Sequence, residues 1–198
     1  MIWVSSDISN AELQDFKDDI SFLYPKYTIT NQEDPRIKFK VVSYNEYLNI
    51  NDNDIPILTP LTLHQMRNIN INASKFSLPL SGFINLHLYQ RRIAFSGFGS
   101  SKQILKDMSQ RMGALIESNV HSKTSLLVSR TLKSDMAQAA LKYNIPIVQD
   151  KFIYDLFQSG EAINEDDYKL KLFSGMTFTS SCFKSKEKEE NSSKNYEQ

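Results

Sequence analysis

The chain has 198 residues, of which 40% are hydrophobic and 23% are charged, as in ordinary globular proteins. Lys plus Arg and Asp plus Glu each number 23, so the formal net charge is zero. A balanced chain lacks the basic field that non-specific nucleic-acid binding requires. The composition therefore argues against direct DNA binding, although Arg91 and Arg92 form a local basic patch.

Cysteine content and the N-terminus indicate the compartment. The single cysteine, Cys182, excludes an internal disulfide and a multi-cysteine metal site, and it fits a reducing cytosol or nucleus. Residues 1–7 lack the basic region and apolar core of a signal peptide. No apolar run approaches the roughly 20 residues that cross a bilayer. We therefore expect an intracellular protein with no membrane contact.

The same order of predicted elements occurs twice along the chain, which indicates a tandem repeat. The apolar pattern of the first copy predicts strands at residues 2–4, 27–30, 39–42 and 55–58. Helices are predicted at 10–23, behind a cap at Ser9 or Asn10, and at 44–50 and 61–67. Residues 71–87, rich in Asn and Ser and containing Pro79 and Gly82, are predicted to be a linker.

The second copy has the clearer pattern, with strands predicted at residues 92–96, 114–116, 124–128 and 145–148. Ser100 or Ser101 is expected to cap its first helix, and Gly113 to end it. The apolar helix faces comprise Ile104, Leu105, Met108 and Met112, then Met136, Ala139, Ala140 and Tyr143, and finally Phe152, Ile153, Leu156 and Phe157 before Gly160. This β-α-β-β-α-β-α order predicts an α/β fold in which a small parallel four-stranded sheet is flanked by helices.

The C-terminal part is expected to begin a further repeat. Residues 166–183 contain Phe173 to Phe183, which resemble the first strand of the second copy. The charged stretch 184–198 is too polar to bury a core, so it is predicted to be a disordered tail.

Four segments of the second copy resemble the BRCT family in order and spacing. They are Ile93 to Phe98, where a Ser precedes a Gly; Arg111 to Ala114; Ser122 to Val128; and Ile145 to Phe152, where Phe152 stands for the family's buried Trp. Residues 88–165 are therefore identified as a BRCT domain, and residues 1–70 as a degenerate BRCT-like domain. The resemblance implies tandem BRCT domains that bind other proteins and neighbouring repeats.

The resemblance also implies a site for phosphoserine or phosphothreonine. Ser96 matches the family's phosphate-binding hydroxyl, and Gly97 the adjacent N–H donor. The family's lysine position falls on Met136, so Lys133, Arg130 and Lys102 are the candidate substitutes. The opposing interpretation is that Ser96 bonds only its own strand end, Met136 faces the core and the cations are solvated.

Other copies and other chemistries have weaker support. Ser181 occupies the hydroxyl position of the third copy but precedes Cys182 instead of Gly, and Ser5 or Ser6 of the first copy has no turn glycine. His64, His87 and His121 lie apart without ligand spacing, and neither a nucleotide loop nor a nucleophile elbow occurs. We expect neither catalysis nor a cofactor nor a metal.

The repeat arrangement resembles that of the DNA topoisomerase 2-binding protein family. That resemblance implies a nuclear scaffold that docks phosphorylated partners in DNA replication and DNA-damage checkpoint signalling. The epithelial-cell-transforming Rho exchange factors, which act in cytokinesis, share the arrangement and are the main alternative. A phosphate-independent interaction module and a DNA-end binder are the others.

Overall fold

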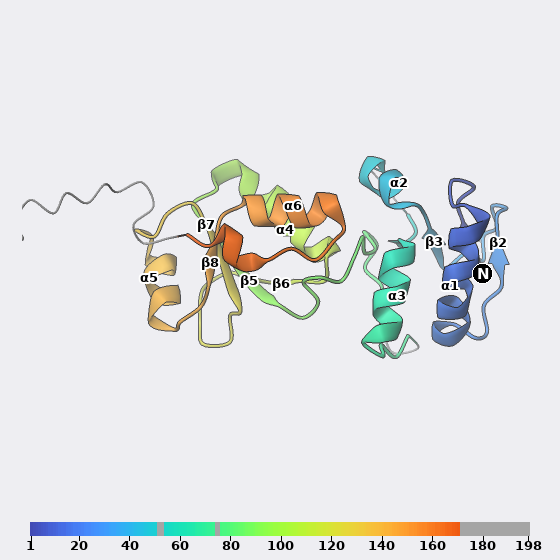
Figure 1. Cartoon of the computed structure of the whole chain (residues 1–198), viewed down its shortest axis with the longest axis horizontal. Coiled ribbons are helices and arrows are strands. Elements are labelled where there is room, and N and C mark those ends of the chain that lie inside the picture. Colours follow the sequence, from blue (N-terminus) through green and yellow to red (C-terminus); the bar gives the residue numbers. More distant parts are fainter. Residues whose placement is uncertain (51–53, 74–75, 171–198) are drawn as a thin grey trace, which may run out of the picture.

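The computed structural model describes residues 1–50, 54–73 and 76–170, which form two α/β units of the same design (Figure 1). The first unit comprises β1 (Ile2–Val4), α1 (Asn10–Leu23), β2 (Ile29–Thr30), β3 (Phe39–Val41), α2 (Tyr44–Asn49), β4 (Ile57–Leu58) and α3 (Pro60–Asn68). The second comprises β5 (Arg92–Ser96), η1 (Gly99–Ser101), α4 (Lys102–Arg111), β6 (Leu115–Glu117), β7 (Leu126–Ser129), α5 (Asp135–Lys142), β8 (Ile147–Val148), α6 (Lys151–Ser159) and η2 (Glu165–Tyr168). The predicted element order is confirmed.

The two sheets have the same topology. Their strand orders are β2-β1-β3-β4 and β6-β5-β7-β8, and every pairing between these strands is parallel. Val4 pairs with Val41 in the first sheet, and Phe95 with Val128 in the second. Aligning the sheets on these pairs makes Ser5 the counterpart of Ser96 and Ser6 that of Gly97. The predicted fold class, two four-stranded parallel sheets flanked by helices, is confirmed.

Local capping follows the sequence closely. Ser9 and Glu12 form a capping box at the start of α1, and the side chains of Ser43, Thr59 and Ser134 cap α2, α3 and α5. Ser101 occupies the predicted N-cap position of α4 but makes no capping bond, because its hydroxyl donates to the Phe98 carbonyl in the preceding 3-10 turn. Gly113 has φ +87°, as the predicted helix stop requires.

Each unit buries an apolar layer between its sheet and a pair of helices. In the first unit Ile2, Val4, Phe39, Val41 and Leu58 meet α1 and α3. In the second, Ile93, Phe95, Leu126, Val128 and Val148 meet α4 and α6. The opposite face of the second sheet carries Ala94, Leu127 and Ile147 and is covered by α5.

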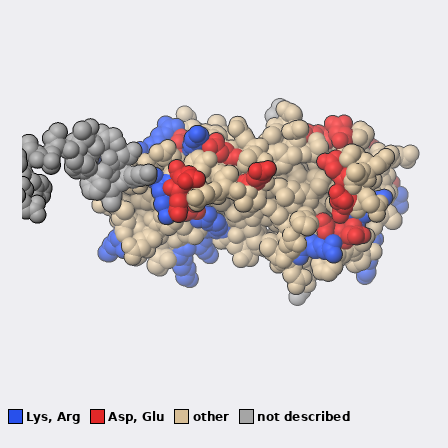
Figure 2. All heavy atoms as spheres, in the orientation of Figure 1, with Lys and Arg blue, Asp and Glu red and all other residues tan. Residues whose placement is uncertain are grey.

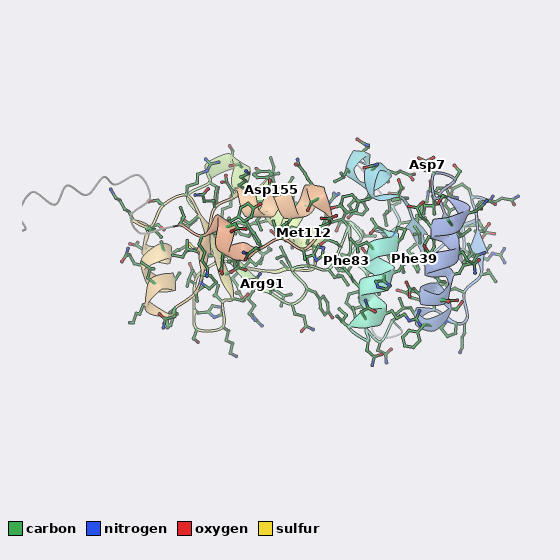
Figure 3. The ribbon with its side chains drawn as sticks, in the orientation of Figure 1. Asp7, Phe39, Phe83, Arg91, Met112 and Asp155 are labelled. Atoms are coloured by element: carbon green, nitrogen blue, oxygen red, sulfur yellow. The ribbon has the colours of Figure 1, made fainter. Side chains whose placement is uncertain are left out.

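The two units pack against each other through α2. Val42, Tyr47 and Ile57 of the first unit belong to the same buried cluster as the core of the second. The Tyr44 hydroxyl donates to the Phe157 carbonyl, and burial raises the pKa of Tyr47 to about 12. Figure 3 labels Phe83 and Met112, which belong to the two cores that meet at this junction. The units therefore form one continuous body.

The segment 71–87, predicted as a linker, contributes buried residues to this junction. Thr59 Oγ1 donates to the Ile84 carbonyl at 2.7 Å, and the Ile84 N–H donates to the Arg111 carbonyl at 3.0 Å. Gly82 has φ +64°, and a Cβ there would lie 1.7 Å from the Ile57 carbonyl oxygen, so this close approach requires glycine. The end of the segment thus ties α3 to α4.

The described chain ends beside β8. The Leu170 N–H donates to the Ile147 carbonyl at 2.8 Å, and Lys169 forms an antiparallel bridge with Val148. Of the stretch 166–183, predicted to begin a third repeat, residues 171–183 lie outside the described residues, as does the tail 184–198. Of the helices in the described ranges, none has the length and apolarity to span a bilayer.

Candidate phosphate-binding site

Ser96 lies where the carboxyl end of β5 meets the start of α5. It pairs with Ser129 of β7, and the residue is 8% exposed. The Ser96 hydroxyl donates to Ser134 Oγ at 3.0 Å, and Ser134 Oγ in turn accepts the Ala137 N–H as the cap of α5. The two hydroxyls thus stand together at a helix N-terminus, where backbone N–H groups favour an anion.

Gly97 leaves the backbone next to Ser96 open. Its φ of +85° is readily adopted only by glycine, and no atom lies within 4 Å of the place where a Cβ would stand. Within the described part of the chain, the Gly97 N–H makes no hydrogen bond. A ligand oxygen can therefore reach a backbone donor beside the Ser96 hydroxyl.

The candidate cations divide into two kinds. Lys133, exposed, directly precedes Ser134, and Lys102, half-buried, begins α4; among the described residues neither forms an ion pair. Arg130 instead contacts the Asp150 carboxylate, with Nη2 2.9 Å from Oδ2, and lies over the Phe98 ring. The structure leaves the two lysines available and gives Arg130 an acidic partner.

Met136 and Ser134 change the predicted composition of the site. Met136 is half-buried and packs against the apolar layer under α5, so its interpretation as a core-facing residue is confirmed. Ser134 was not predicted as a site residue. Its signal was the Ser-Asp pair that opens the helix, a typical N-cap pattern. Asp135, in the first turn of α5, adds a negative charge close by.

The equivalent strand end of the first unit is arranged differently. Ser5 is buried, and its hydroxyl accepts the Asp7 N–H at 3.2 Å within its own turn. Asp7, labelled in Figure 3, brings a carboxylate to this end, and Ser6 stands where the second unit has Gly97. The helix that follows β3, α2, begins at Tyr44. Its first turn contains the acidic Glu46 and no Lys or Arg.

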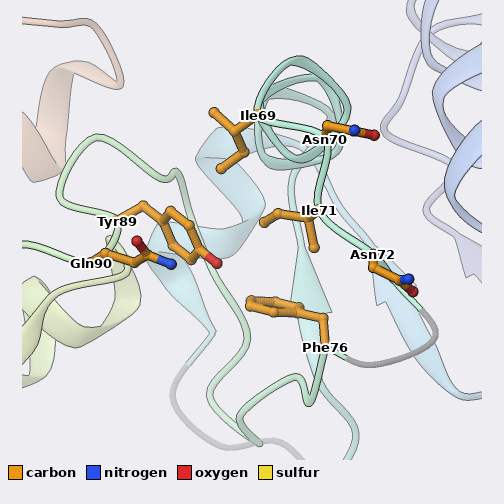
Figure 4. A pocket seen from close by; sticks show the side chains of 7 residues that line it. All are labelled: Ile69, Asn70, Ile71, Asn72, Phe76, Tyr89 and Gln90. Atoms are coloured by element: carbon orange, nitrogen blue, oxygen red, sulfur yellow. The ribbon is translucent and has the colours of Figure 1, made fainter.

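A hollow lies between residues 69–72 and Phe76 on one side and Tyr89 and Gln90, at the start of the second unit, on the other (Figure 4). It measures 520 Å³, and an adjoining hollow of 730 Å³ reaches Leu115 at the edge strand β6. Phe76 and Tyr89 line both, with ring centroids 6.2 Å apart. We call these two hollows the linker groove. Its lining combines apolar, amide and hydroxyl side chains with the charged Arg92.

The two units differ modestly in surface charge. Figure 2 shows acidic side chains on both units, whereas more of the basic ones in view lie on the second. Hydrogen bonds from Arg92 and His121 lower the pKa of Glu117 at the end of β6.

In the described ranges no three His, Cys, Asp or Glu residues stand close enough to hold a metal ion.

The second unit matches the sequence model of the BRCA1 C Terminus (BRCT) domain over residues 87–157. These residues are a BRCT domain. The predicted phosphate-site residues Ser96, Gly97, Arg130, Lys133 and Lys102 all lie inside this BRCT domain. A comparison with curated proteins gave no match.

Solved structures similar to the chain include several with BRCT domains. The Rad4 BRCT1,2 complex with a Crb2 phosphopeptide is 12% identical with a TM-score of 0.41, and the alignment covers 85% of this chain and 96% of that one. Rad4 BRCT3,4 of S. pombe is 16% identical with a TM-score of 0.39, covering 86% and 96%. The C-terminal BRCT domain of human XRCC1 is 10% identical with a TM-score of 0.40, covering 44% and 95%.

Proposed function

We propose that this protein is a non-enzymatic scaffold that binds phosphorylated proteins at the carboxyl end of β5. One observation carries the proposal: the Ser96 hydroxyl, the open Gly97 N–H and the Ser134 cap of α5 stand at one strand end. BRCT domains are interaction modules, and this end offers donors without any group positioned for catalysis.

The proposed complex uses these groups in a defined way. The Gly97 N–H donates to one phosphate oxygen, and the Ser96 hydroxyl turns from Ser134 to donate to a second. Lys133 and Lys102 supply the countercharge that Met136 lacks. Charge-assisted hydrogen bonds contribute about 1.5–3 kcal/mol each, so losing one lowers affinity by tenfold or more.

The wider setting is proposed as well. We divide the chain into a BRCT-like domain at 1–70, a connecting segment at 71–87, a BRCT domain at 88–165, the start of a further repeat at 166–183 and a tail at 184–198. We place it in the nucleus, as a scaffold of DNA replication and DNA-damage checkpoint signalling of the DNA topoisomerase 2-binding protein kind. The Rho exchange factor remains the alternative setting.

A second candidate function is phosphate-independent docking. It is favoured by Met136, which packs into the core where the family has a lysine, and by Arg130, which already has an acidic partner. The linker groove, with Phe76 and Tyr89, would then be the contact surface.

Fluorescence polarisation of the full chain with peptides in phosphorylated and unphosphorylated form tests the proposal. Wild type should prefer the phosphorylated peptides. Ser96→Ala should lower that affinity by about tenfold or more, and Lys133→Ala should also weaken it. Ser122→Ala and Lys123→Ala are matched controls, because both residues are exposed just before β7, away from the strand end. Equal affinity for both peptide forms would instead support phosphate-independent docking.

A further inference from the structure

We infer that Arg130 recognises a second negative charge on the ligand, so that the site selects phosphopeptides carrying an acidic residue near the phosphorylated one. The inference rests on the proposed function. In this inference Arg130 binds an acidic side chain of the peptide that lies near the phosphorylated residue. The phosphate itself is bound by Ser96, Gly97 and the two lysines.

Arg130 emerges from the same edge of the sheet as the phosphate site. It follows Ser129, which pairs with Ser96 across neighbouring parallel strands. Such strands lie about 4.8 Å apart. A peptide whose phosphate sits at Ser96 and Gly97 therefore passes within reach of the long Arg130 side chain.

Two contacts fix the orientation of the Arg130 guanidinium. Its central carbon lies 5.1 Å from the centroid of the Phe98 ring, and Phe98 is itself 4% exposed. Nε and Nη2 both donate to Asp150 Oδ2, at 3.2 and 2.9 Å. Because both bonds use the Nε side, the Nη1 side of the planar group remains open, and the side chain is 56% exposed.

Charge decides which anion this open side takes. Asp150 already neutralises Arg130, so adding a doubly charged phosphate next to Asp150 would cost repulsion. Lys102 and Lys133, which form no ion pair within the described ranges, suit the phosphate better. A singly charged carboxylate matches the remaining fork of N–H donors, which bind carboxylates in a planar geometry. Asp150 thus acts as a positioning residue, and it leaves its own helix α6 without a side-chain cap.

The test uses peptides with one central phosphoserine in a neutral background. A single Glu is moved from three residues before the phosphoserine to three residues after it, and each peptide is compared with its Gln counterpart. We expect Glu at one or two of these positions to raise affinity, by at most about fivefold for an exposed ion pair. Arg130→Gln should abolish the Glu preference yet keep the preference for phosphate, whereas the control Lys123→Gln should change neither.

The other outcomes separate this inference from the proposed function. An Arg130→Gln variant that weakens all phosphopeptides equally would mean that Arg130 binds the phosphate, and a Glu preference that survives it would also overturn the inference. Both leave the proposed function standing. A wild-type chain indifferent to phosphate would overturn both. Asp150→Asn should reduce the Glu preference, because the guanidinium loses its orientation, while removal of the negative charge raises affinity for every phosphopeptide.

Discussion

The two units share one topology but differ on the sheet face away from their paired helices. In the second unit this face carries Ala94 and Leu127, both fully buried beneath α5. In the first unit the equivalent positions are Trp3 and Lys40, whose ammonium lies 5.1 Å from the indole centroid and pairs with Glu33. A bulky ring and a charged side chain leave less room for a closely packed helix than Ala94 and Leu127 do.

The middle helices of the two units, α2 and α5, also differ in position. The six-residue α2 places Tyr47 in the core shared with the second unit, whereas α5 stays on its own sheet. We attribute the different position of α2 to Trp3 and Lys40, the two side chains that replace Ala94 and Leu127 on the equivalent strand pair. The comparison teaches that the first unit acts as a structural partner of the second.

Removing Tyr47 should have the largest effect, because it breaks the contact that makes the units one body. Tyr47→Ala should lower the free energy of unfolding by about 4 kcal/mol, as for other buried aromatic side chains. Urea denaturation measures this loss. Tyr143→Ala is the control: Tyr143 follows the corresponding helix α5 but is 47% exposed, so its loss should cost less than about 0.5 kcal/mol. Similar losses for the two variants would contradict the assignment of α2 as the joining helix.

Placing the bulky residue of the first unit into the second should displace α5. Ala94→Trp introduces a ring beneath Ala137 and Ala140, so overpacking should cost about 3 kcal/mol in the same urea experiment. Lys142→Trp adds the same side chain at an exposed position of α5 and should change stability little. If Ala94→Trp proved as stable as the control, Trp3 would not explain why α2 leaves its sheet.

Giving the end of β5 the residue found at the end of β1 should have a moderate effect on stability. Gly97→Ser copies Ser6 and puts a Cβ at φ +85°, which costs about 1 kcal/mol even though the space around it is open. Thermal or urea unfolding measures this loss. Gly97→Asn should cost less, because Asn tolerates positive φ better than Ser. Equal stability of the Ser variant and wild type would mean that Gly97 is not required by the backbone.

Removing the charge of Glu117 on the edge strand β6 should have the smallest effect on stability, and the size of that effect should depend on pH. The lowered pKa of Glu117 means that the folded state prefers the carboxylate, so its contribution is present above the ordinary Glu pKa and is lost as pH falls through the folded value. Glu117→Gln should therefore be slightly less stable than wild type at neutral pH. The difference in unfolding free energy should disappear in acid, and a difference that persists there would exclude the ion pairs as its cause.

Much of the fold could be predicted from local patterns. The apolar spacing in 92–96 and the Ser-Gly pair at 96–97 identified β5 and the strand end that bears the candidate site. The strands predicted at 55–58 and 145–148 contain β4 and β8, which occupy equivalent places in the two sheets. These signals are readable because strand and helix periods, and the φ that glycine permits, are properties of neighbouring residues.

Only the tertiary structure decided which surfaces meet. The pattern of residues 44–50 predicted a helix, but not that Tyr47 packs on the second unit. Arg130 was a candidate phosphate ligand by sequence, yet Asp150, from the next strand end, takes one side of its guanidinium. Periodicity reports which side of an element is apolar; the partner of that side, or of a charge, depends on residues far along the chain and on the space their side chains leave.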